Sequence, residues 1–313
     1  MLRPGPRLLS ALAVTLVAVG AAGCGLGPGP GTGDVRVTVS ENFGSRALGA
    51  VTVSKVPGSE TVMRLLQRSF RVATRYGGGF VQSIDGRAGD GSRHAWFYYV
   101  NGIQAAVGAA STAVHRGDRI LWDLHDWQVT ESIPAVVGAF PEPFVHGIAG
   151  KRYPTTIECG PGVQAACQSV GSALGKVGVP AATQQFGTGS GIDSLSVLVA
   201  TWSTLRAALV SQLIDRGPGV SGVYARFAAG GHELQLLDPT GHVVRTLGPG
   251  AGLIAATAPP TGLNATPTWL ITGTDAAGVA AAARALSPAA VDNHFALAVS
   301  GGAHFPLPLE PAR

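Results

Sequence analysis

The stretch that decides the fold of the first half of the chain is residues 94–102, HAWFYYVNG. Its aromatic and β-branched side chains favour a β-strand. The Asn101-Gly102 pair that follows is the preferred sequence of a two-residue hairpin turn, because both residues tolerate positive φ. A second alternating strand is expected at residues 119–127, RILWDLHDW, directly after the turn residues Gly117-Asp118.

The same alternation extends upstream from this centre. Residues 34–40 carry valines at every second position, which predicts a half-buried strand, and residues 51–53 predict another. After the Pro57-Gly58 turn, Ser59 is the expected N-cap of an amphipathic helix. The helix should bury one face, and a strand at residues 80–84 with a turn at Asp85-Gly86 should follow. The apolar residues at helical spacing are Val62, Leu65, Leu66 and Phe70.

The order of these segments resembles the transcobalamin C-terminal-like (DUF4430-type) domain over about a third of the chain. The resemblance rests on Ile84-Asp85-Gly86, on Trp96 with Tyr98-Tyr99-Val100-Asn101-Gly102, and on Gly117-Asp118 with Trp122. It implies a small α+β, β-grasp-like domain at residues 34–129. In the vertebrate cobalamin carriers this domain covers the corrin ring together with a separate helical barrel. The present sequence shows no series of amphipathic helices that could form such a barrel, so cobalamin is implied as a ligand by analogy alone.

Five residues of this domain are candidates for binding a ligand: Trp96, Tyr98, Tyr99, Asn101 and Trp122. On a strand, Trp96 and Tyr98 share one face and Phe97 and Tyr99 share the other. One face must pack on the helix, and the other could offer Tyr and Trp side chains to a flat ligand or a peptide. The alternative is that these residues are core aromatics.

A metal site at this strand would need more ligands than the strand supplies. Asp123 and His125 point to one face, and His94 or Asp90 would have to complete the set from a loop. Polar residues on a solvated strand face are the favoured interpretation, so no metal site is expected. The sequence also shows no nucleophile, histidine and acid constellation, and we expect no enzyme and no cofactor. The Gly187–Gly191 segment is expected to be a loop, since it does not join a strand to a helix as a phosphate-binding loop does.

The N-terminal residues have the pattern of an export signal. Arg3 and Arg7 precede an uncharged apolar run at residues 8–22, which is too short for a comfortable membrane span. The run ends in Ala21-Ala22-Gly23-Cys24, which resembles the bacterial lipobox, although Ala21 stands where Leu or Val is more frequent. We therefore expect a lipoprotein signal peptide at residues 1–23, a lipidated Cys24 that opens a Gly/Pro-rich tether at residues 24–33, and a lipid-anchored extracytoplasmic location. If the lipobox is not used, the protein is secreted.

The two remaining cysteines, Cys159 and Cys167, predict a disulfide, because an exported protein meets oxidising conditions. The pair can close if Cys159 ends a strand and Cys167 lies in the first turn of the next helix.

The second half of the chain predicts a separate α/β sandwich domain of no recognised family at residues 151–313, after a connector at residues 130–150 that should pack on the surface. Two strand-helix units, at residues 195–213 and 268–286, are expected to flank an antiparallel meander. Strands are expected at residues 153–159, 195–202, 223–228, 233–237, 242–247, 253–257, 269–273 and 295–300, and helices at residues 163–177, 205–214 and 276–286.

Composition limits the function. The chain has 313 residues, a formal net charge of +4 and 46% hydrophobic residues, and it lacks a Lys/Arg-rich run, so a folded protein that does not bind nucleic acid is expected. The sequence favours a non-catalytic surface lipoprotein that binds or displays a ligand, either a small molecule such as a corrinoid or a protein. The alternative is a structural or assembly partner of a membrane or cell-wall protein. An extracytoplasmic enzyme is the least favoured interpretation.

Overall fold

A five-stranded mixed sheet forms the first domain in the computed structural model, which describes Met1 and residues 34–191, 193–259 and 266–310. The strand order is β2-β1-β8-β6-β7, with β1 and β8 parallel and the other neighbours antiparallel. A helix packs on one face, as the β-grasp-like prediction requires. The strands are β1 (Val35–Glu41), β2 (Arg46–Val53), β6 (His94–Val100), β7 (Ile103–Gln104) and β8 (Arg119–Asp126).

The helix α1 (Val62–Ser69) begins two residues later than the sequence suggests. Its N-cap is Thr61, whose hydroxyl accepts a hydrogen bond from the Arg64 N–H, and not Ser59. Three further strands form a small antiparallel sheet in the order β3-β4-β5. They are β3 (Val72–Arg75), β4 (Phe80–Ile84) and β5 (Arg87–Ala88).

The hairpin predicted from Asn101-Gly102 is present. Asn101 and Gly102 have φ angles of 54° and 76°, and Val100 pairs with Ile103 across the turn. A Cβ atom on Gly102 would lie 2.6 Å from the carbonyl oxygen of Val136, so close packing as well as positive φ requires glycine here.

The second domain is layered around a seven-stranded sheet in the order β10-β9-β11-β16-β15-β17-β18. The first four strands of this order are parallel, and the remaining neighbours are antiparallel. The helices α2 (Gln164–Lys176) and α6 (Ala276–Ala285) pack together with one face of the sheet. The strands are β9 (Thr155–Cys159), β10 (Ala181–Gln185), β11 (Leu195–Val199), β15 (Gly252–Thr257), β16 (Thr268–Gly273), β17 (Ala296–Ser300) and β18 (Ala303–Leu307).

Short helices and the predicted meander pack with the opposite face of that sheet. The meander has three strands, because β15, expected as its last strand, joins the large sheet instead. These elements are α3 (Trp202–Leu205), α4 (Leu209–Asp215), α5 (Pro218–Ser221), β12 (Ala225–Phe227), β13 (Leu234–Leu237) and β14 (Val243–Leu247); the short α7 (Pro288–Val291) precedes β17.

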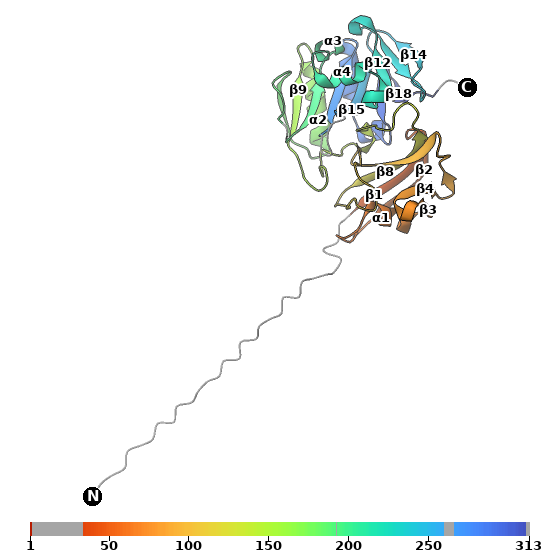
Figure 1. Cartoon of the computed structure of the whole chain (residues 1–313). Helices are drawn as coiled ribbons and strands as arrows, with labels where there is room; N and C mark the ends of the chain where they lie inside the picture. The colour runs from red at the N-terminus through yellow and green to blue at the C-terminus, as the bar shows by residue number, and fades with distance from the viewer. Residues whose placement is uncertain (2–33, 192, 260–265, 311–313) are drawn as a thin grey trace.

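The two domains lie against one another (Figure 1). They share a hydrophobic core. Phe43, Tyr99 and Leu121 of the first domain belong to the same buried cluster as Tyr224 and Phe295 of the second. The chain is thus an α+β protein of two domains joined by apolar packing.

The connector at residues 130–150 does not lie on the surface as expected. Ile133 and Val136 belong to the shared core, and Val137, Phe140 and Phe144 belong to the core under α2 and α6. Its apolar residues are buried because the connector runs through the junction of the two domains.

No helix within the described ranges is long and apolar enough to cross a membrane. The predictions for residues 2–33, namely the leader beyond Met1, the lipidated Cys24 and the tether, lie outside the described residues.

Candidate functional site

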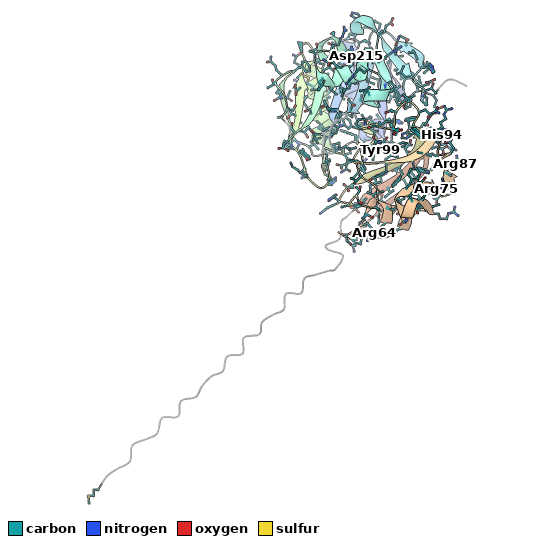
Figure 2. All side chains as sticks on the ribbon, in the orientation of Figure 1. Arg64, Arg75, Arg87, His94, Tyr99 and Asp215 are labelled. Atoms are coloured by element: carbon teal, nitrogen blue, oxygen red, sulfur yellow. A yellow bond between two sulfur atoms is a disulfide. The ribbon has the colours of Figure 1, made fainter. Side chains whose placement is uncertain are left out.

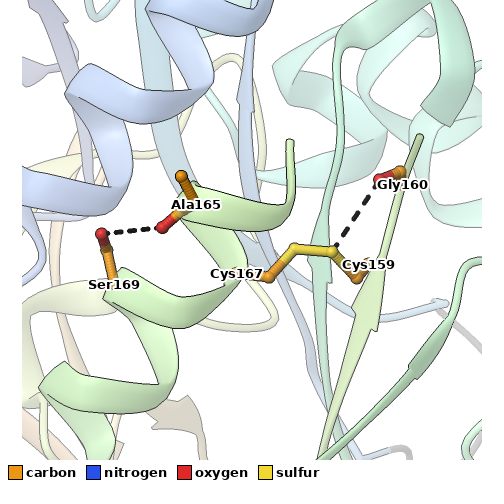
Figure 3. Close-up of a disulfide and its surroundings, with 5 residues drawn as sticks. All are labelled: Cys159, Gly160, Ala165, Cys167 and Ser169. Carbon is orange, nitrogen blue, oxygen red and sulfur yellow. Dashed lines mark hydrogen bonds between the residues drawn. A yellow bond between two sulfur atoms is a disulfide. The ribbon is translucent and has the colours of Figure 1, made fainter. Parts of the chain in front are cut away.

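The predicted disulfide is present in the second domain. Cys159 is the last residue of β9, and Cys167 lies in the first turn of α2 (Figure 3). Their Cα atoms are 5.9 Å apart. The bridge ties the strand to the helix that follows it.

The ligand-binding candidates of the first domain are largely buried. Trp96, Tyr99, Asn101 and Trp122 are all at most 5% exposed, and Tyr98 is half-buried. Trp96, Tyr98 and Trp122 face α1, where the rings of Tyr98 and Trp122 stack at 4.8 Å. The alternative of core aromatics therefore describes the positions of Trp96, Tyr99 and Trp122.

The other face of strand β6 is covered by the second domain. The ring of Tyr99 lies 5.4 Å from that of Phe295, and Figure 2 shows Tyr99 between the two domains. Burial raises the pKa of Tyr99 well above its usual range, and the charge of Asp123 adds to this effect. The face that the sequence left open for a ligand is thus occupied by the protein itself.

Asn101 has a structural role. Its amide nitrogen donates to the Asp118 carboxylate and to the Gly147 carbonyl, and its amide oxygen accepts from the Arg119 N–H, each at 2.9 Å. Burial raises the pKa of Asp118. The Asn101 and Gly117-Asp118 motifs of the family resemblance therefore fix the turn that precedes β8.

Asp123 and His125 share one face, as predicted, but that face is not solvated. Asp123 is fully buried and accepts hydrogen bonds from the Ser40 hydroxyl at 2.6 Å and from the Phe43 and Gly44 N–H groups at 2.9 and 2.8 Å. Its Oδ1 also lies 2.9 Å from Nδ1 of His125. The imidazole ring of His125 is stacked between Phe43 and Phe97, each at 4.5 Å.

The remaining two metal candidates lie elsewhere. His94 pairs with Asp126 across the ladder and so points to the face opposite Asp123 and His125. Its Nδ1 lies 2.9 Å from the exposed Asp90 carboxylate, and the His94 side chain is the main cause that lowers the pKa of Asp90. Among the described residues, no group of three or more His, Cys, Asp or Glu could hold a metal ion.

An exposed apolar surface, which we call the aromatic tip, consists of Tyr76, Phe80 and Val107. These side chains are 86%, 42% and 52% exposed. The Tyr76 and Phe80 rings lie edge to face with centroids 6.4 Å apart, at the two ends of the turn between β3 and β4. The segment with Val107 lies beside this turn, because a Cβ atom on Gly108 would be 4.0 Å from the Gly79 carbonyl.

The surroundings of the aromatic tip are open and basic. Cβ atoms on Gly77 and Gly78 would meet nothing within 4 Å. Arg75, the last residue of β3, has no ion-pair partner among the described residues and projects from the outer side of the domain (Figure 2). The tip is anchored to the core, since the Tyr98 hydroxyl donates to the Val107 carbonyl and contacts the Thr112 hydroxyl. The arrangement offers aromatic faces and a cation, and it contains no nucleophile or acid-base pair.

Sequence reasoning did not select the aromatic tip. In the segment YGGGF at residues 76–80, the sequence predicts only the start of the strand at residues 80–84. Its signal is the pair of aromatic residues on either side of three glycines, since a turn so poor in side chains leaves little to cover either ring.

Comparison with known proteins finds a matching family for part of the first domain. No curated protein matches the chain. A crystal structure of a protein from Ruminococcus gnavus ATCC 29149, provisionally described as metal binding, is 17% identical and covers 30% of this chain and 98% of its own, with a TM-score of 0.25. Residues 59–126, from the turn before α1 to the end of β8, match the family described as a domain of unknown function, DUF4430, so this part of the first domain is a DUF4430-type domain.

Proposed function

We propose that this protein is a non-catalytic, exported lipoprotein that is held on the outer face of the membrane through Cys24 and binds a ligand with the aromatic tip. The observation that carries the proposal is the exposure of Tyr76 and Phe80 in a domain whose other large aromatic residues are mostly buried. Exposed aromatic pairs of this kind usually serve recognition, because they supply a large contact area at a low cost in conformational entropy.

The chemistry of the aromatic tip suits a flat, partly apolar molecule. Such a ligand can lie over the Gly77–Gly79 turn, contact both rings and place an anionic group near Arg75. A corrinoid with its amide-bearing rim and phosphate has these features, and the resemblance to transcobalamin suggests it as the first ligand to test.

Calorimetric titration tests the binding proposal. The mature chain carrying Cys24→Ala, which lacks the lipid, is titrated with cobalamin and with its truncated relative cobinamide. We expect saturable binding at micromolar affinity, and a loss of about tenfold or more in affinity for Tyr76→Ser and for Phe80→Ser, about 1.4 kcal/mol or more. Val244→Ser is the matched control, since Val244 is an exposed apolar residue of β14 in the other domain.

Either of two results would contradict cobalamin binding at the aromatic tip. One is the absence of heat and of any shift in melting temperature. The other is binding that Tyr76→Ser and Phe80→Ser leave unchanged. The first result would favour the alternative function, a structural or assembly partner of a membrane or cell-wall protein, because an exposed apolar patch also suits a protein partner. Crosslinking from residue 76 in intact cells would then identify that partner.

The anchor is tested separately. In cells that express the full chain, we expect the protein in the membrane fraction and labelled by a radioactive fatty acid. Cys24→Ala should abolish the label, because a single sulfur carries the diacylglyceryl group. Cys167→Ala, which breaks the disulfide and not the lipobox, should keep the label. A Cys24→Ala protein that still carries the label would refute lipidation at Cys24.

A further inference from the structure

A second site lies in the other domain, in a groove of about 340 Å³ next to strand β9. The groove follows the face of the large sheet opposite α2 and α6. Glu158 of β9 pairs with Leu198 of β11, and Ser196 of β11 pairs with Thr268 of β16, so these four side chains project from the same face. Phe186, at the end of β10, and Leu209, at the start of α4, form the walls.

Glu158 gives this groove its charge. The residue is only 6% exposed, yet no Lys, Arg or His among the described residues forms an ion pair with its carboxylate. One carboxylate oxygen accepts a hydrogen bond from the Gly187 N–H at 3.0 Å, and the other accepts one from the Ser190 hydroxyl at 2.7 Å. A carboxylate can accept about four hydrogen bonds, and the described residues supply these two.

A buried carboxylate without a cation is unusual, because buried charges in proteins are generally paired. The Gly187–Gly191 loop holds one side of the Glu158 carboxylate. The other side borders the groove, where a ligand could supply the missing positive charge.

The rest of the groove is apolar and open. Leu209 is 62% exposed, although it is a large aliphatic residue. Leu198 and Phe186 line the same groove and extend its apolar surface. Gly187 and Gly189 leave the loop side of the groove without side chains. The volume lies at the lower end of the range of sites that hold small molecules, roughly 300–1,000 Å³, and is too small for a folded partner.

We propose that this groove binds a small organic cation, an alkylguanidinium or alkylammonium ion, whose head pairs with Glu158 and whose aliphatic stem lies on Leu198, Phe186 and Leu209. A guanidinium group can donate two parallel hydrogen bonds to a carboxylate such as that of Glu158. The site is independent of the aromatic tip, and cobalamin does not have the required chemistry.

The test uses hexylguanidine and its uncharged isostere hexylurea, titrated calorimetrically into the mature Cys24→Ala chain. We expect hexylguanidine to bind with a Kd of about 1 mM or lower, and hexylurea to bind about tenfold more weakly or not at all. Glu158→Gln keeps an acceptor for the loop but removes the charge, and it should weaken hexylguanidine binding about tenfold.

Asp193→Asn is the matched control. It makes the same change of net charge at a carboxylate that is 76% exposed and paired with Lys151, outside the groove, and it should leave the Kd within about twofold. Leu209→Lys is a second test, needed if Glu158→Gln disrupts the Gly187–Gly191 loop. Because Leu209 is exposed, lysine is tolerated there, and its ammonium should repel the probe and weaken binding about tenfold.

Three results would each overturn the proposal: equal affinity for the charged and uncharged probes, equal effects of Glu158→Gln and Asp193→Asn, or a Leu209→Lys protein that binds hexylguanidine as well as the unchanged protein does. None of these results would bear on cobalamin binding at the aromatic tip, and failure at the tip would leave this site intact.

Discussion

Asp123 holds the turn that carries Phe43 into the junction of the two domains. Its carboxylate accepts two backbone N–H groups from the turn at Phe43 and Gly44 and contacts His125, all in the interior. Phe43 has a φ of 56°, a conformation that costs free energy in a residue other than glycine, so these hydrogen bonds hold a turn that would otherwise relax. This turn places the Phe43 ring against Tyr224 and Phe295 of the second domain.

We therefore expect Asp123→Ala to lower the free energy of unfolding by about 3–5 kcal/mol, because it leaves buried donors without an acceptor. Urea denaturation measures the change. Asp193→Ala is the control, since an exposed ion pair contributes only about 0–1 kcal/mol. A loss of less than about 1 kcal/mol for Asp123→Ala would show that the network is not structurally important.

At the scale of elements, local chemistry made most of the fold predictable. The Asn101-Gly102 hairpin, the alternation in β1 and β8, and the helices α2 and α6 all lie where sequence patterns placed them, within a few residues. The strand-to-helix disulfide was predictable for the same reason, because its two cysteines are close in sequence.

The elements that were missed lack a local signal. β10 reads AATQQ and β3 reads VATR, and neither has a clear apolar alternation. Each is a strand because a neighbour offers its hydrogen-bonding edge: β9 pairs with β10 over five residues, and β4 pairs with β3. Propensity is a weak guide where tertiary pairing supplies the backbone partners.

At the scale of the whole molecule, the second domain explains why one face of strands β6 and β8 is closed. Tyr99, Asp123 and His125 were expected on an open face of the first domain, and the second domain covers that face. Nothing within residues 34–129 indicates this cover, because an aromatic and polar strand face looks the same whether it meets solvent, a ligand or another domain. The aromatic tip was not predicted because the exposure of Tyr76 also depends on how the rest of the chain packs, and the local sequence does not show this.

The shared core also predicts how the molecule unfolds. Phe43 is 4% exposed, and its ring lies 5.1 Å from Tyr224 and 5.3 Å from Phe295, so removing this ring opens a cavity in a core that both domains build. We expect the unchanged protein to unfold in one calorimetric transition, because neither domain can lose its structure without exposing this core. Phe43→Ala should destabilise it by about 3–5 kcal/mol and lower the midpoint of the whole transition or split it in two. Val244→Ala, at an exposed site on β14, should change stability by no more than about 0.5 kcal/mol. Two separate transitions in the unchanged protein, of which Phe43→Ala shifts only one, would mean that the domains are stable independently and that their contact is an ordinary interdomain surface.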